Sequence, residues 1–101
     1  MSENGKTLKL VLTNHWFDEI KSGRKNHEYR KWTQFFMERI SITKPDGSSG
    51  YPDFVQFQRA YYKNPERMTF EIKRVQVIKG TDTDLHCDDY VYDIELGRRM
   101  K

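Results

Sequence analysis

The sequence has little of what builds membrane spans or disulfide frameworks. Cys87 is the only cysteine among 101 residues and can form no internal disulfide, which favours a reducing compartment, so we expect a cytoplasmic protein. Mean hydropathy is −0.94 with no long apolar run, and this excludes a helical membrane span. The first six residues, Met-Ser-Glu-Asn-Gly-Lys, contain no apolar segment, so we expect no signal peptide.

Small helix-forming residues are also scarce. The chain has one Ala and five Leu, whereas 14% of its residues are aromatic, and this balance favours a sheet over a helical bundle. Its length suits one domain. We predict a single domain over residues 1–101 with a core at about 7–97, flexible ends at 1–6 and 98–101, and a monomeric state.

Charge is distributed unevenly along the chain. Residues 21–31 contain five Lys or Arg side chains against one Glu, and residues 82–95 contain six Asp or Glu and no Lys or Arg. This asymmetry favours an oriented anionic ligand, and a mixed solvated surface explains it equally well. The acidic 82–95 segment could also form a face that binds a basic protein partner.

Hydrophobic periodicity predicts the following elements. A helix over 15–22 should be capped by Asn14 and ended by Gly23. A change of parity within 68–78 predicts a β-bulge at Lys73–Arg74. Strands are expected over 7–12, 25–32, 54–62, 68–78 and 90–96, a short helix over 33–40 with Phe35, Phe36 and Ile40 inward, and a loop over 44–53. Inward side chains should include Leu8, Leu10, Leu12, Val55, Phe57, Tyr61, Tyr90, Tyr92, Ile94 and Leu96, with Asp93 and Glu95 outward.

The most informative segment is residues 22–30, in which a carboxylate lies between two cations. Cations on both sides keep Glu28 ionised, while Lys25 and Arg30 stay available for carbonyl or phosphate oxygens of a ligand. Glu28 and Arg30 share a strand face, so Lys25 can join them only from the turn before the strand. An exposed strand with surface ion pairs, each worth under about 1 kcal/mol, is an equally weighted interpretation.

Aromatic and basic residues also alternate along the chain. Rings that stack on bases and cations that meet phosphates are typical of single-stranded nucleic-acid binding, although a small aromatic core would use many of the same rings. The candidate binding residues are Lys25, Glu28, Tyr29, Arg30, Trp32, Arg59 and Tyr61.

Metal-binding patterns are absent from the sequence. His86 and Cys87 are adjacent and His15 and His27 are isolated, so none has zinc-ligand spacing. We expect no metal and no other cofactor. Acidic neighbours at Asp88 and elsewhere disfavour a Cys87 thiolate and therefore a nucleophilic cysteine.

Several of these motifs, in this order, resemble an ASCH domain of the PUA-like superfamily. Ile20-x-x-Gly23-x-Lys25 followed by Glu28-x-Arg30 is similar to the family's helix end and second strand. Residues 55–62 resemble its V-x-F-x-x-G-Y strand with Ala60 at the usual Gly, and residues 90–97 resemble its closing strand.

The resemblance implies an α+β fold: a small mixed β-barrel of PUA-like type, with one main helix packed on it and a second short helix. It also implies a role in RNA or nucleotide metabolism, with Lys25, Glu28 and Arg30 lining a cleft. A related branch hydrolyses N(4)-acetylcytidine with a Lys and a Thr three residues later. Glu28 stands at that Thr position here, which removes the covalent Thr mechanism.

Three functions remain open at this point. The first is an RNA- or modified-nucleotide-binding module with a cationic cleft around Lys25, Glu28 and Arg30. The second is a hydrolase, amidohydrolase- or nuclease-like, in which Lys25 polarises a carbonyl or phosphate and Glu28 is the general base for a water. The third is a protein-interaction module that uses the acidic 82–95 face.

Overall fold

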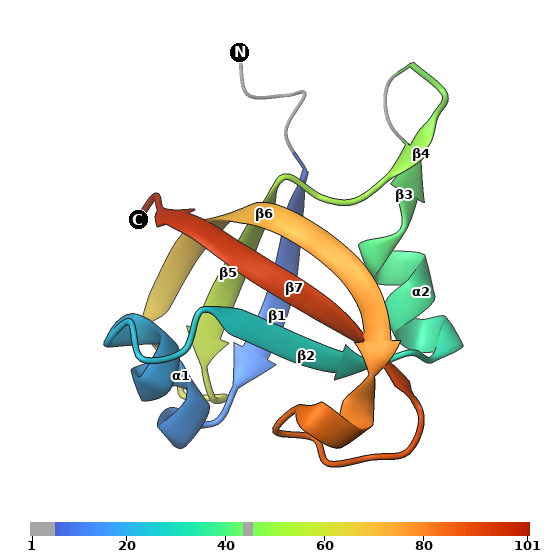
Figure 1. The fold of residues 1–101 in the computed structure, drawn as a ribbon. Coiled ribbons are helices and arrows are strands. Elements are labelled where there is room, and N and C mark those ends of the chain that lie inside the picture. Colours follow the sequence, from blue (N-terminus) through green and yellow to red (C-terminus); the bar gives the residue numbers. More distant parts are fainter. Residues whose placement is uncertain (1–5, 44–45) are drawn as a thin grey trace.

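A computed structural model describes residues 6–43 and 46–101 as an α+β fold in which a five-stranded sheet curls into a half-barrel (Figure 1). The strands lie in the order β1 (Thr7–Leu12), β5 (Phe54–Arg59), β6 (Arg67–Lys79), β7 (Tyr90–Arg99) and β2 (His27–Lys31). β1 and β5 are parallel and the other neighbours are antiparallel. The predicted small mixed barrel with one main and one short helix is confirmed. It is open between its edge strands, β1 and β2.

The concave side of the sheet holds one hydrophobic core. Alternate residues of β1 and β5 point into it, as their period-two patterns predict. Helix α1 (Asn14–Lys21) packs against β1 and β5 and buries Phe17 and Ile20, and the shorter α2 (Gln34–Ile40) buries Ile40. The buried set comprises Leu8, Leu10, Leu12, Phe17, Ile20, Ile40, Val55, Phe57, Met68, Phe70, Val75, Tyr92, Ile94 and Leu96.

The end of α1 sets the direction of the chain into β2. Gly23 has φ +86°, as expected for a residue that ends a helix, and its N–H donates to the Ile20 carbonyl. Two residues later, the Lys25 N–H donates a hydrogen bond to the Glu19 carbonyl of α1. At the other end the prediction was one residue off, because Thr13 occupies the cap position and the Asn14 amide donates instead to the Tyr62 hydroxyl at 2.7 Å.

In the two long strands, one sequence prediction is confirmed and one is wrong. Register shifts in β6 between Phe70 and Arg74 are the predicted bulge. In β7, Asp93 was expected outward but is only 4% exposed. Side chains of the two neighbouring strands cover it: His27 Nδ1 lies 2.6 Å from Asp93 Oδ1, and Gln76 donates to Oδ2 at 3.0 Å.

Three aromatic residues expected inward are exposed. β5 ends at Arg59 and Ala60 has φ +49°, so the chain turns away and Tyr61 is 85% exposed. Phe35 lies on the outer side of α2, and Tyr90 lies at the first position of β7, beyond the closed part of the core. Phe35 lies in the first turn of α2, whose buried residue is Ile40 at its end, and the buried residues of β7 begin at Val91.

The remaining segments differ from prediction mainly at their boundaries. The expected 44–53 loop contains one strand of a two-stranded hairpin, β3 (Ile42–Thr43) and β4 (Ser49–Gly50), while residues 1–5, 44 and 45 lie outside the described residues. A short 3-10 turn, η2 (Gly80–Asp82), follows β6. β7 extends beyond the predicted residue 96 to Arg99, and the Met100 N–H donates to the Thr69 carbonyl. Within the described part of the chain, no helix combines the length and apolarity needed to cross a bilayer.

Candidate functional site

The structure brings Lys25, Glu28 and Arg30 together at the open edge of the half-barrel. Glu28 Oε2 accepts from Arg30 Nε at 2.9 Å and lies 2.8 Å from Nη2, while Oε1 lies 3.4 Å from Lys25 Nζ. Lys25 precedes the first residue of β2, which is the turn position that its pairing with Glu28 requires. Glu28 is 5% exposed, so these contacts are not ordinary surface ion pairs.

A fourth member of the cluster, Asp84, was not among the predicted site residues. It comes from the segment between η2 and β7, and its Oδ2 pairs with Lys25 Nζ. Its only sequence signal was membership of the acidic 82–95 segment. Two cations therefore meet two carboxylates, so the charges of this cluster balance when Glu28 is ionised.

Burial governs the ionisation of the central carboxylate. Desolvation raises the pKa of Glu28 above its ordinary value, and the opposing effects of Arg30 and Lys25 reduce this shift without reversing it. The pKa of the neighbouring Tyr29 hydroxyl is also raised, first by burial and then by Asp93, Asp84 and Glu28. The cluster thus holds a carboxylate that gains a proton more readily than a surface Glu.

Next to this cluster lies a cavity of about 280 Å³ between β1 and β2, called here the edge cavity. Arg30 spans the opening, since its Nη2 donates to the Val11 carbonyl of β1 at 3.1 Å. Glu28, Arg30 and Lys31 contribute charged groups to an otherwise largely apolar wall. The described lining residues are Val11, Leu12, Thr13, Trp16, Glu28, Tyr29, Arg30, Lys31, Phe36 and Leu85.

Aromatic rings hold the cations in place. Lys25 Nζ lies 4.2 Å from the Trp16 ring centroid and 5.5 Å from that of Tyr29, and Arg30 Cζ lies 5.6 Å from the Phe36 ring. Lys25 is not among the described residues that line the cavity. It contacts Glu28 and Trp16, which do line the cavity. Trp16 and Phe36 were not predicted as site residues, because their apolar spacing in the sequence indicated only a core.

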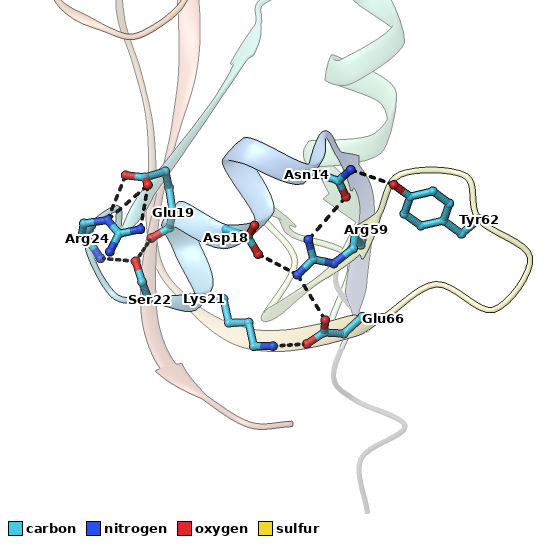
Figure 2. A network of polar contacts seen from close by, with 9 residues as sticks. All are labelled: Asn14, Asp18, Glu19, Lys21, Ser22, Arg24, Arg59, Tyr62 and Glu66. Carbon is cyan, nitrogen blue, oxygen red and sulfur yellow. Dashed lines mark hydrogen bonds and ion pairs between the residues drawn. The ribbon is translucent and has the colours of Figure 1, made fainter.

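Arg59, a predicted binding residue, lies elsewhere. Figure 2 shows it at the end of β5, where its Nη2 pairs with Asp18 of α1 at 2.7 Å and with Glu66 at 3.2 Å. Its guanidinium also lies 4.5 Å from the Phe17 ring. These contacts fasten α1 to β5 and to the start of β6.

Two predicted aromatic residues lie beside the edge cavity without lining it. Trp32 is 49% exposed and meets Tyr90 edge-to-face at 5.9 Å, in a separate hollow. Tyr61 borders another hollow, which shares Val11, Arg30 and Phe36 with the edge cavity. Of the seven predicted residues, the structure thus brings four together at the edge cavity: Lys25, Glu28, Tyr29 and Arg30.

The acidic segment does not form one uniform face. Asp84 pairs with Lys25, Asp93 is buried against His27, and Glu95 lies 3.2 Å from Arg74. No group of three or more His, Cys, Asp or Glu side chains within residues 6–43 and 46–101 is arranged to hold a metal ion.

Comparison with protein families matches the chain to the ASCH domain. The family model of the ASCH domain covers residues 10–86, a span that includes the whole charged cluster. A search of curated proteins finds no match to the chain.

Proposed function

We propose, from the premise that the chain belongs to the ASCH domain family, that it binds RNA or a modified nucleotide by holding one base in the edge cavity. At the family level, the PUA-like fold of ASCH domains suggests RNA binding. The proposal adds the place and the chemistry: a base held between aromatic walls and read by Glu28 and Arg30. We place this activity in the cytoplasm.

The size and walls of the edge cavity support a single base as the ligand. Its volume of about 280 Å³ lies just below the range of drug-sized ligand sites, which begins at roughly 300 Å³, and this suits a ligand as small as one base. Trp16, Tyr29 and Phe36 offer ring surfaces, and a base stacked on such a ring contributes about 1–3 kcal/mol.

The observation that carries the proposal is a carboxylate, 5% exposed, that two cations hold in the wall of a cavity. Buried ion pairs seldom stabilise a fold more than apolar side chains of similar volume would, so their presence points to a ligand. Glu28 can accept hydrogen bonds from the amino or imino groups of a base, and Arg30 can donate to its carbonyl oxygens. Because the cluster is balanced in charge, it suits a neutral base better than a phosphate.

The hydrolase hypothesis uses the same residues. Both carboxylate oxygens of Glu28 contact cations, at 2.8–2.9 Å for Oε2 and 3.4 Å for Oε1, and this arrangement favours holding a ligand over activating a water. Incubation of the protein with N(4)-acetylcytidine and with RNA, followed by mass spectrometry, tests this alternative. Turnover that Glu28→Gln abolishes would favour the hydrolase.

Trp16 provides a direct binding assay. The chain has two tryptophans, so Trp32→Phe leaves the Trp16 indole in the cavity wall as the only one. We expect cytidine, uridine, adenosine, guanosine or N(4)-acetylcytidine to quench its fluorescence saturably, with little added affinity for the matching 5′-monophosphate.

Two variants in this background decide the outcome. Arg30→Met should abolish the quenching, whereas Arg24→Met, which removes an exposed guanidinium paired with Glu19, should preserve it. Circular dichroism verifies that both are folded at the assay temperature. Absence of quenching by every nucleoside, or quenching that Arg30→Met retains, would overturn the proposal.

A further inference from the structure

We propose that the RNA ligand is a single strand of several nucleotides whose phosphates cross the outer face of β1 and β5, along Lys9, Arg39 and Arg67. This inference rests on the proposed function and adds the class of ligand, an oligonucleotide instead of a free nucleotide.

Two further hollows continue from the edge cavity around β1. The first, of about 270 Å³, shares Val11, Arg30 and Phe36 with the edge cavity and is also lined by Lys9, Leu10, Phe35, Arg39 and Tyr61. The second, of about 440 Å³, shares residues 9–11 with the first and extends over Gln56, Gln58 and Arg67 of β5 and β6. Because each hollow shares residues with the next, they form one path, called here the β1 groove.

The charge of the β1 groove differs from that of the edge cavity. No carboxylate is among the described residues that line its two hollows. Arg39 donates to the Phe35 carbonyl at 3.0 Å and Arg67 to Gln58 Oε1 at 3.4 Å, so both guanidiniums keep their full charge uncompensated by an acid among the described residues. Lys9, Arg39 and Arg67 are exposed. The cations of the groove are therefore available to phosphates, whereas Lys25 and Arg30 are already paired.

The groove also offers rings on which bases can stack. Tyr61 is 85% exposed and Phe35 is 55% exposed, at the borders of the first hollow. The Arg39 guanidinium lies 3.6 Å from the Phe35 centroid, which makes a flat cationic platform. Exposed rings between unpaired cations are the arrangement that holds single strands without strong sequence preference.

The charges around the edge cavity also favour a strand that leaves it along β1 over one that leaves it toward Trp32 and Tyr90. The hollow at the other end of the edge cavity, of about 330 Å³, is lined by Lys31, Trp32, Thr33, Asp89 and Tyr90. The Asp89 carboxylate would repel a phosphate there. A strand that leaves the edge cavity in that direction meets Asp89 as well as Lys31, whereas along β1 it meets cations and no carboxylate among the described lining residues.

The test compares the affinity for a single nucleotide with the affinity for an RNA of eight nucleotides. Binding of a fluorescein-labelled RNA octamer is measured by anisotropy at about 50 and about 200 mM salt, and binding of a 5′-monophosphate by Trp16 quenching in the Trp32→Phe background. We expect the octamer to bind at least about tenfold more tightly, with a strong salt dependence.

The decisive variant is K9Q/R39Q/R67Q. It should weaken octamer binding by about tenfold or more and reduce the salt slope by about two, because each lost phosphate contact on a single strand contributes about 0.7. Monophosphate binding should be unchanged. The matched control, K73Q/R74Q/R98Q, removes the same charge from residues that have acidic partners at Glu95 and Glu71, and it should bind the octamer like the unmodified protein.

The outcomes separate this inference from the proposed function. If the octamer binds no more tightly than the monophosphate, or if both triple variants lose the same octamer affinity, the β1 groove is not the phosphate path. The proposed base site in the edge cavity is unaffected by either result. Octamer binding that depends on the groove, with no quenching by any monophosphate, supports the groove and overturns the base site. Equal affinity for an octamer duplex overturns the single-stranded ligand.

Discussion

Replacing Glu28 and Arg30 by methionine, singly and together, tests whether this ion pair is kept for a ligand or for stability. The Arg30 guanidinium touches Glu28 at 2.8–2.9 Å, and its remaining partner is the Val11 carbonyl. Removal of one partner of a buried pair leaves an uncompensated charge, whereas removal of both leaves none. In the double variant the ion pair between Lys25 and Asp84 is retained.

The contacts set the expected magnitudes. Loss of a buried partner costs about 3–5 kcal/mol, and we expect about 3 for Glu28→Met, because the Arg30 side chain is 20% exposed and Lys25 keeps Asp84. That corresponds to a fall in Tm of about 15 °C for a domain of this size. Arg30→Met should cost about 2 kcal/mol, since Glu28 retains Lys25. The free energy of unfolding of the double variant should lie within about 1 kcal/mol of that of the unmodified protein, because methionine side chains fill volumes similar to those of Glu and Arg.

The assay is urea unfolding followed by circular dichroism for all four proteins, with nucleoside titrations in the Trp32→Phe background. The double variant should be stable and unable to bind. If the double variant instead loses as much unfolding free energy as Glu28→Met alone, about 3 kcal/mol, the ion pair itself stabilises the fold and the argument from buried charge to ligand fails. Losses that add to about 5 kcal/mol would show that the two side chains stabilise the fold independently, which contradicts the same argument. A stable double variant that still binds nucleosides would refute the proposed site itself.

Two further predictions concern the surroundings of the pair. Because burial raises the pKa of Glu28 above its ordinary 4.5, the folded state holds this proton more tightly than the unfolded chain. The resulting stability is complete below about pH 4.5 and is lost as pH rises through the folded-state pKa. Urea unfolding at several pH values should therefore show the unmodified protein losing stability relative to Glu28→Gln as pH rises, and a relative gain would contradict the pKa direction. In the loop that carries Asp84, Gly80→Ala would place its Cβ 2.5 Å from Cys87 Sγ and 3.0 Å from the Asp89 carbonyl. We expect the free energy of unfolding to fall by about 1–3 kcal/mol and nucleoside binding to weaken. An unchanged thermal unfolding curve would contradict this, because it would show that the loop accommodates the methyl group without loss of stability.

Local features of the sequence were sufficient to predict the centre of the site. Gly23 ends α1 because it can adopt a positive φ, and a strand with period two then places Glu28 and Arg30 on one face. Lys25 joins them from the turn that Gly23 creates. All of this depends on contacts within eight residues of the chain, which is why spacing alone could indicate it.

The rest of the site depends on contacts between distant segments. Asp84 lies 59 positions from Lys25, and Trp16 and Phe36 reach the edge cavity from two different helices. Sequence periodicity showed that these rings were apolar, and it could not show that the barrel stays open where they meet. Asp93 was misplaced for a related reason, because alternation indicates a face and neighbouring strands decide whether that face is covered.

The same reasoning changes the meaning of the basic segment at residues 21–31. Its excess of charge predicted a cationic cleft, yet Lys21 pairs with Glu66, Arg24 with Glu19, and Lys25 and Arg30 with Glu28. Carboxylates that are distant in sequence, or hidden within a strand, neutralise most of the charge that a count along the chain assigns to the surface. Attraction of a polyanion must then come from cations whose neighbours in space include no acid. Among the described residues, Lys9, Arg39 and Arg67, which line the β1 groove, are such cations, and they lie outside the segment that first suggested nucleic acid.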